Sequence, residues 1–140
     1  MKILLAADGS PFTQKALEFI TARKNLLIEG DELLVLNVQA PVPGGVTSML
    51  GSAEVASYHA EESTKVLAPI QTFLEKHSVR NRCIAVVGRA VDEIIFAAKN
   101  EHSEMIVMGT HGHGWLGRAV MGSVAQRVVT DSHVPVLLVK

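Results

Sequence analysis

Short apolar runs alternate with longer segments along this chain, and the two kinds of segment differ in the spacing of their apolar residues. Each short run is apolar through its whole length, which is typical of a strand covered on both faces. In the longer segments apolar residues recur every three or four positions, as in amphipathic helices. The pattern predicts strands over residues 3–7, 33–38, 82–87, 105–108 and 136–139, and helices over about 11–28, 53–76, 91–100 and 124–130.

Strands that alternate in this way with helices favour an α/β fold, built on an open parallel sheet with helices on both faces. The 140 residues fit a single domain over residues 1–140, and no internal repeat is visible. Ser10 followed by Pro11 predicts the start of the first helix, with Ser10 as the N-cap residue. Two prolines and three glycines predict a loop over residues 39–52, and Pro69 should kink or interrupt the second helix.

Composition excludes several classes of function. Hydrophobic residues make up 48% of the chain and charged residues 19%, which indicates a globular protein. The formal net charge of -1 leaves no basic field that could hold nucleic acid or an anionic membrane. No apolar segment is long enough to span a bilayer, and Asp8 interrupts the short apolar start before it could serve as a signal peptide. We therefore expect a cytoplasmic protein.

The segment after the predicted fourth strand carries two glycine patterns at once. Residues 112–117 spell G-x-G-x-x-G, the pattern of dinucleotide sites. That pattern belongs at the first strand-to-helix turn and is followed by an acidic residue about twenty positions later. Here it follows the fourth strand, and residues 135–139 include no acid. The dinucleotide interpretation is therefore rejected.

The second pattern is Gly109-x-x-Gly112, nine residues, then Gly122-Ser123. Ser123 and Gln126 have the spacing of a capping box, which predicts Ser123 as the N-cap of the last helix. The loop over residues 110–122 would then deliver a ligand to free amides at the positive end of that helix, a natural anion site. The alternative is a flexible connection to a well-capped helix.

This second pattern resembles the nucleotide-binding signature of the universal stress protein family. The resemblance covers the whole chain, through Ala-Ala-Asp-Gly-Ser at residues 6–10, Leu-Asn-Val at 36–38 and Pro-Val-Leu-Leu-Val at 135–139. It implies a five-stranded sheet of order 3-2-1-4-5, with a crevice where strands 1 and 4 end side by side. It also implies a homodimer that pairs through the terminal segment, which begins at Val134 and ends at Val139; an apolar edge strand invites such pairing.

The resemblance further implies that the chain binds ATP with Mg²⁺. Asp8 would hydrogen-bond the nucleoside, and its alternative role is to cap the first helix together with Ser10. The other residues implied at the site are Ala6 and Val38 at the adenine, Met108 and Gly109 at the ribose, and Gly112, Gly122, Ser123, Val124, Arg118 and His111 near the phosphates.

Some of these roles have open alternatives. Arg118 is a candidate partner of the γ-phosphate, although a loop arginine is usually only solvated. His111 and His113 lack further ligands at a suitable spacing, so no metal site of their own is predicted. Trp115 could cover a nucleotide, contact a partner or pack the loop down, and the sequence does not choose among these.

The sequence thus supports a nucleotide-sensing regulatory dimer with an unidentified protein partner. No efficient catalytic site is visible, because the loop has no Walker-type lysine and Asp8 is the only obvious carboxylate near the crevice for Mg²⁺. At most slow ATP hydrolysis is expected. The alternative is a protein-interaction module of the same fold whose crevice stays empty.

Overall fold

The computed structural model describes residues 1–23, 25–113 and 121–140. Strands and helices alternate along the chain, and all five predicted strands and four predicted helices are present. The elements are β1 Lys2–Ala6, α1 Pro11–Ala22, β2 Glu32–Gln39, α2 Gly44–Leu50, α3 Ser52–Lys76, β3 Asn81–Val87, α4 Ala90–Asn100, β4 Met105–Gly109, α5 Ser123–Asp131 and β5 Val136–Val139.

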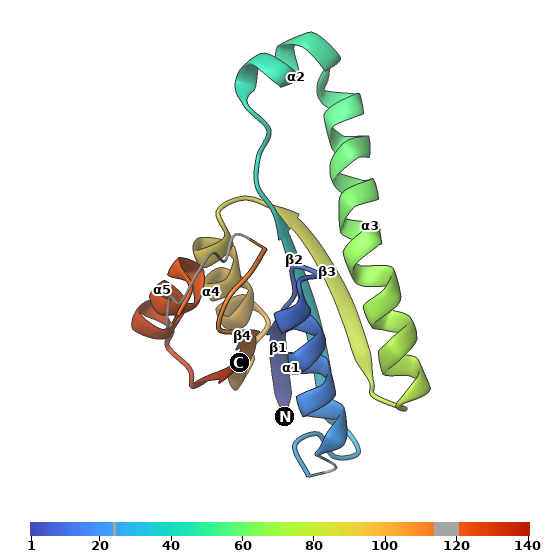
Figure 1. Cartoon of the computed structure of the whole chain (residues 1–140), viewed down its shortest axis with the longest axis vertical. Helices are drawn as coiled ribbons and strands as arrows, with labels where there is room; N and C mark the ends of the chain where they lie inside the picture. The colour runs from blue at the N-terminus through green and yellow to red at the C-terminus, as the bar shows by residue number, and fades with distance from the viewer. Residues whose placement is uncertain (24, 114–120) are drawn as a thin grey trace.

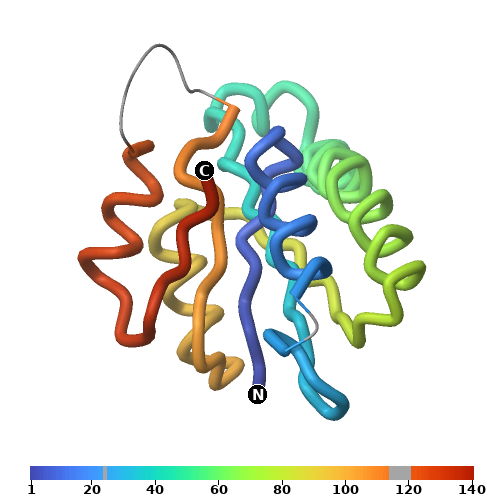
Figure 2. Tube along the Cα trace, turned by 60° about the horizontal axis from the view of Figure 1, so that its bottom comes forward, coloured from blue at the N-terminus to red at the C-terminus, as the bar shows by residue number. Residues whose placement is uncertain are grey.

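The five strands form one parallel sheet of order β3-β2-β1-β4-β5, which confirms the predicted architecture. From β1 the chain builds outward through β2 to β3, then crosses back to place β4 on the other side of β1 (Figure 2). In the register, Leu4 of β1 lies between Leu34 of β2 and Ile106 of β4. All three side chains are fully buried.

Helices cover both faces of this sheet, and each face has its own core. Helices α1 and α3 pack on one face, against a cluster that includes Ile3 and Leu5 of β1. Helices α4 and α5 pack on the other face, against a cluster that includes Leu4. Successive side chains of a strand point to opposite faces, so a strand that is buried on both must be apolar at every position. The continuous apolar runs in the sequence have this origin.

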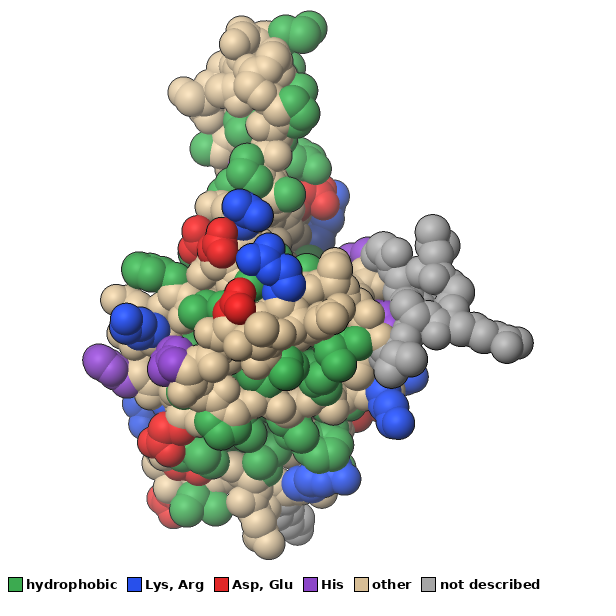
Figure 3. All heavy atoms as spheres, turned by 90° about the vertical axis from the view of Figure 1, so that its left-hand side faces the viewer, with side chains coloured by type: hydrophobic (Ala, Val, Ile, Leu, Met, Phe, Trp, Pro, Cys, Tyr) green, Lys and Arg blue, Asp and Glu red, His purple; other side chains and the backbone are tan. Residues whose placement is uncertain are grey.

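Helix α2 and the first half of α3 project beyond the sheet as an arm, defined here as residues 44–60 (Figure 1). Residues 39–53 include no charged side chain. On the face drawn in Figure 3, the end of the arm accordingly shows apolar and neutral groups, with the charged side chains below it. Met49 in this arm is 87% exposed, and Leu50 and Tyr58 are about half exposed.

The structure corrects three local predictions. Residues 39–52 are not all loop, because Gly44–Leu50 forms α2, which Gly51 ends with a positive φ of 86°. Helix α1 ends at Ala22 rather than near residue 28, and Leu26 and Leu27 reach the core from the turn that follows. Pro69 does not interrupt α3, which is continuous over 25 residues. Packing of α3 on β2 and β3 outweighs the hydrogen bond that proline cannot make.

Among the described residues, no helix combines the length and the apolar character that crossing a membrane requires.

Candidate functional site

A cavity of about 550 Å³ opens at the carboxyl ends of the central strands. It lies where β1 and β4 are neighbours while the helices that follow them, α1 and α5, cover opposite faces. Ligands of open α/β sheets bind in the crevice that such a reversal creates. The volume is within the range of small-molecule and cofactor sites.

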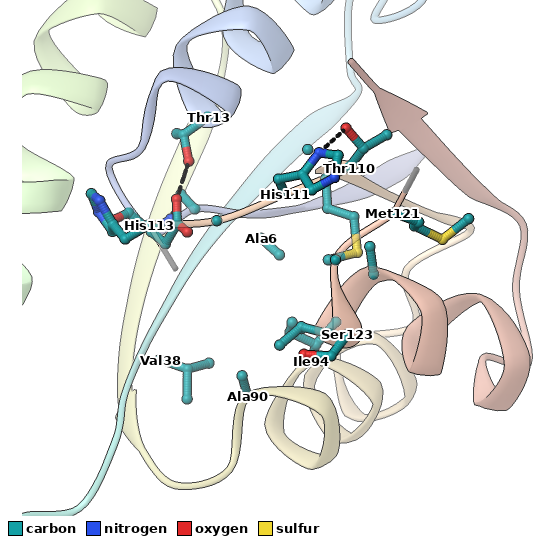
Figure 4. A pocket seen from close by; sticks show the side chains of 18 of the residues that line it. Ala6, Thr13, Val38, Ala90, Ile94, Thr110, His111, His113, Met121 and Ser123 are labelled. Atoms are coloured by element: carbon teal, nitrogen blue, oxygen red, sulfur yellow. Dashed lines mark hydrogen bonds between the residues drawn. The ribbon is translucent and has the colours of Figure 1, made fainter. Parts of the chain in front are cut away.

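One part of the cavity is apolar. Ala6 and Val38 come from the ends of β1 and β2, and Ala90 and Ile94 come from the first half of α4 (Figure 4). Ile94 is 4% exposed and belongs to the core on that face of the sheet. This wall has the shape and chemistry to receive a flat apolar group such as an aromatic base.

Asp8 supplies the only carboxylate among the described residues that line the cavity. Its Oδ1 atom accepts hydrogen bonds from the Ser10 backbone N–H at 2.9 Å and from the Thr13 hydroxyl at 2.9 Å. These bonds place Asp8 in the turn before α1, but no side chain makes a capping bond to that helix, so the capping role considered for Asp8 is not observed. The hydroxyl of the N-cap residue Ser10 makes no capping bond.

Nε2 of His113 lies 2.6 Å from the backbone carbonyl oxygen of Asp8. Because a carbonyl oxygen only accepts, Nε2 carries the hydrogen of this bond. The bond joins the glycine-rich segment after β4 to the turn after β1. Those two segments are 105 residues apart in the chain.

Two glycines of the motif allow close approaches between these segments. A β-carbon at Gly109 would lie 2.4 Å from Cβ of Phe12 in α1, and one at Gly112 would lie 2.5 Å from Oδ2 of Asp8. Contacts this short do not occur between a β-carbon and its neighbours, so Gly109 must lack a Cβ, whereas a Cβ at Gly112 would have to displace the Asp8 carboxylate. The glycines therefore bring the end of β4 against the start of α1, whatever else they do for a ligand.

The start of α5 differs from the predicted capping box. The N-cap residue is Gly122, Ser123 is the first helical residue, and no side chain caps the helix. Gly122 has an extended backbone, and its N–H donates to the Thr110 carbonyl at 2.6 Å. The N-cap is thus one residue earlier than predicted. In this structure the Gly122 amide, expected from the sequence to meet a phosphate, is bonded to the Thr110 carbonyl instead.

Three other amides remain at this helix start. The first bond within α5 runs from the Gln126 N–H to the Gly122 carbonyl. Within the described residues the N–H groups of Ser123, Val124 and Ala125 have no backbone acceptor, as is usual at a helix N-terminus. All three residues line the cavity. Together with the positive end of the helix dipole they form an anion-binding corner.

Ten of the eleven site residues expected from the sequence line this one cavity. They are Ala6, Asp8, Val38, Met108, Gly109, His111, Gly112, Gly122, Ser123 and Val124. Arg118 lies outside the described residues, as does Trp115.

Sequence reasoning missed Thr13, Ala90, Thr110 and Met121 as lining residues, and it did not assign His113 to the site. Thr13 could have been predicted, because a polar residue in the first turn of the first helix lies beside the crevice expected at the end of the first strand. The lining residues on α4 had no signal in the sequence, because α4 follows a strand that does not border the site.

The two histidines are held by neighbours rather than grouped as metal ligands. Nδ1 of His111 lies 3.0 Å from the Thr110 hydroxyl, and its ring lies 5.1 Å from the ring of Phe12. No group of three or more His, Cys, Asp or Glu side chains in the described part of the chain is placed to bind a metal ion.

Comparison with known proteins connects this geometry to a family. The model of the universal stress protein family matches residues 1–140. A universal stress protein of Thermus aquaticus is 34% identical over 141 residues, which cover 99% of this chain and 97% of the relative. The solved structure of MJ0577 from Methanocaldococcus jannaschii superposes with a TM-score of 0.85 at 30% identity, covering 99% of this chain and 94% of the other.

A more distant solved structure adds a ligand. A universal stress protein family protein of Arabidopsis thaliana, solved with AMP bound, has a TM-score of 0.70 at 17% identity and covers 100% of this chain and 91% of its own. At this identity the likeness concerns the fold. The family model and the two closer relatives each extend over essentially the whole length, and the fold of this chain superposes on the solved relative. The chain belongs to the universal stress protein family.

Proposed function

We propose that the chain binds ATP in the cavity at the ends of β1 and β4 and acts as a nucleotide-sensing regulatory protein. The observation that carries this proposal is the pairing of an apolar wall with an anion-binding helix start across one cavity of about 550 Å³. An adenine nucleotide has the same two-ended character, with a flat base at one end and phosphates at the other. The AMP-bound relative supports the assignment of the ligand class.

In this proposal the base lies against the apolar wall, where Ala6 contacts it and backbone groups of Val38 hydrogen-bond to it. Met108 and Gly109, at the end of β4, contact the ribose. Asp8 hydrogen-bonds the nucleoside portion, since it is the one carboxylate that the described lining offers. Van der Waals contact with the wall supplies affinity, and the polar groups orient the ligand.

The phosphates lie at the start of α5, where the amides of Ser123 and Val124 and the Ser123 hydroxyl would donate to them. Because the hydroxyl makes no capping bond, it is not committed to the helix. His111 lies beside this corner in the cavity lining. Arg118 is proposed as a partner of the terminal phosphate.

Mg²⁺ would enter with the nucleotide. This ion usually keeps several waters and binds phosphate oxygens, so it would enter on the triphosphate and leave Asp8 to the nucleoside. Bound in this way, it would neutralise part of the phosphate charge. None of the described lining residues is Lys or Arg, so no cationic side chain among them would neutralise the charge of a transferring phosphoryl group. Hydrolysis is therefore proposed to be slow at most.

Calorimetric titration with ATP, with and without Mg²⁺, tests the proposal. Mass spectrometry of the denatured protein would add whether an adenine nucleotide co-purifies. The variant Gly122→Val should lose binding, because its β-carbon would meet the Thr110 carbonyl at 3.1 Å and displace the start of α5. Gly45→Val is the matched control, since nothing lies within 4 Å of its added β-carbon. The absence of heat and of binding at millimolar ATP would refute the proposal.

The second candidate function is a protein-interaction module whose cavity stays empty. The exposed apolar side chains of the arm favour it, because Met49, Leu50 and Tyr58 are at least half exposed on a projection whose only charged residue is Glu54. The two candidates differ in the effect of Gly122→Val on the cellular function. A sensor loses its function with its nucleotide, whereas a nucleotide-independent module keeps it.

A homodimer through β5 is also proposed. This strand lies at one end of the sheet order, and its side chains at positions 136–138 are only half buried. The carbonyl oxygens of Pro135 and Val139 accept bonds from β4, so the backbone of Val136 and of Leu138 faces outward. A second copy could pair with these groups.

Light scattering at high concentration tests the dimer. Val136→Pro removes an outward donor and keeps the bonds to β4, so it should yield a folded monomer. A monomeric wild-type protein would contradict the pairing. We further place the protein in the cytoplasm, where ATP is available to it, which cell fractionation would check.

A further inference from the structure

A closed pair of hydrogen bonds joins Asp8 to Thr13. The Asp8 backbone N–H donates to Oγ1 of Thr13 at 3.1 Å, and the same hydroxyl donates to Oδ1 of Asp8 at 2.9 Å (Figure 4). Thr13 is 4% exposed, and both residues line the cavity. Both hydrogen bonds of this hydroxyl are thus directed to the one carboxylate-bearing residue of the described lining.

Capping of α1 does not account for the arrangement. The N-cap residue of α1 is Ser10, whose position would let its hydroxyl accept from the first turn of the helix. Its Oγ is instead buried without a hydrogen-bond partner among the described residues. Pro11 already presets the first helical position. The hydroxyl of Thr13, in the first turn of the helix, is bonded to Asp8.

The consequence is a carboxylate with one committed and one available oxygen. Oδ1 accepts from both Thr13 and the Ser10 N–H, which fixes the plane of the carboxylate. The backbone of Asp8 is held in addition by His113 at its carbonyl oxygen. Oδ2 is turned toward the glycine segment, where a β-carbon at Gly112 would lie 2.5 Å away.

We propose that Thr13 is a positioning residue that holds Asp8 so that Oδ2 accepts a hydrogen bond from a ligand hydroxyl in the cavity. The inference rests on the proposed function, because it takes the ligand to be a nucleotide. It adds a preference for nucleotides whose sugar carries hydroxyl groups. An ionised carboxylate only accepts, so it favours ligands that carry a hydroxyl donor there. A nucleotide with ribose hydroxyls has this donor, and one without them leaves Oδ2 unpaired.

The test compares ATP with 2′,3′-dideoxy-ATP in three proteins: wild type, Thr13→Val and Thr13→Ser. Valine keeps the branched shape but removes the hydroxyl, and serine keeps the hydroxyl. The wild type should prefer ATP by about three- to tenfold, the range that one hydrogen bond contributes. Thr13→Val should bind ATP more weakly and bring the ratio of the two dissociation constants close to one. Thr13→Ser should restore the wild-type ratio.

The ratio separates positioning from a general structural effect. If Thr13→Val weakens both nucleotides by the same factor, or leaves the ratio unchanged, the positioning role is overturned while ATP binding by the protein stands. If the wild type binds neither nucleotide, the proposed function itself fails. Circular dichroism and the melting temperature check the fold of each variant. Should Thr13→Val not fold, Thr13→Ala removes the same hydroxyl in a smaller side chain, and the same ratio decides.

Discussion

The two ends of the sheet are held together by different interactions. At the amino ends of the strands, Arg82 of β3 bonds Glu32 of β2 at 3.3 Å and Glu101 after α4 at 2.5 Å. The terminal ammonium group of Met1 pairs with Asp31 at the same end. At the carboxyl ends the connecting bonds are uncharged or involve Asp8 alone. The Asn37 amide donates to the Ala7 carbonyl at 2.9 Å, and glycines allow β4 to approach α1.

This difference has a functional meaning. Among the described residues, the ion pairs that join separate elements lie at the amino ends, and the described lining of the cavity presents one carboxylate and a helix start. Within that lining a phosphate-bearing ligand would meet amides whose positions the backbone fixes; Arg118, proposed as a partner of the terminal phosphate, lies outside it. At the carboxyl ends the elements are held by close packing rather than by ion pairs. Adding a single carbon atom there should therefore lower the free energy of unfolding more than removing a charge at the amino ends.

The largest effect is expected from Gly109→Ala at the carboxyl end. The added β-carbon would lie 2.4 Å from Cβ of Phe12, an atom next to the helix backbone that cannot move by itself. Overpacking of this kind costs about 1–3 kcal/mol of unfolding free energy. Urea denaturation measures it.

Gly45→Ala is the matched control for this substitution. Nothing lies within 4 Å of its β-carbon, and it is in helix α2, so alanine should leave stability unchanged or raise it by up to about 1 kcal/mol. An equal free energy of unfolding for Gly109→Ala and Gly45→Ala would contradict the importance of close packing at the carboxyl ends.

Gly112→Ala should act on ligand affinity more than on stability. Its β-carbon would lie 2.5 Å from Oδ2 of Asp8 and would displace the carboxylate oxygen proposed to meet the nucleoside. ATP affinity should fall by about tenfold, near the upper range for one hydrogen bond, as calorimetry would measure. An unchanged affinity would mean that Asp8 makes no contact with the ligand.

Arg82→Met should have a smaller effect, although it breaks two ion pairs at once. The Arg82 side chain is 45% exposed, and exposed pairs contribute about 1 kcal/mol or less. Thermal denaturation should show a modest loss of stability that shrinks with added salt. ATP affinity should not change, since the pairs lie at the opposite end of the sheet.

Arg89→Met provides a reference for this variant. Arg89 pairs with Asp92 at 3.6 Å, and its side chain is 77% exposed, so its loss should change stability less still. A larger loss from Arg89→Met than from Arg82→Met would contradict the assignment of the ionic network to the amino ends.

The smallest effect concerns pH. The hydrogen bond from Arg82 holds the pKa of the Glu101 carboxyl below its ordinary value of 4.5, with burial opposing in part. A carboxyl whose pKa is lower in the folded state stabilises the protein above its unfolded pKa, and this contribution is lost as the pH falls through the folded pKa. The stability difference between wild type and Arg82→Met should therefore be full at neutral pH and shrink below about 4.5. Urea denaturation across the acidic range would measure it, and a difference that grows on acidification would refute this origin.

The sequence pattern predicted the strands well, because a strand that is buried on both faces is apolar at every position. The strand at residues 136–139 was predicted with its observed bounds, because its side chains contribute to both cores. Helix α2 was missed, because its residues are not part of the core and the glycines and prolines of this segment are equally compatible with a loop. The end of α1 was misplaced, since Leu26 and Leu27 are apolar at helical spacing yet reach the core from a turn.

The sequence by itself determined the order of strands and helices and, through the spacing of the glycine motif, most of the residues that line the cavity. Only the tertiary structure decided which atoms of those residues remain available to a ligand. The Gly122 amide is used by Thr110, and one oxygen of Asp8 is used by Thr13. Such pairings depend on distances between segments as far as 105 residues apart, such as Asp8 and His113, and a local pattern does not encode them.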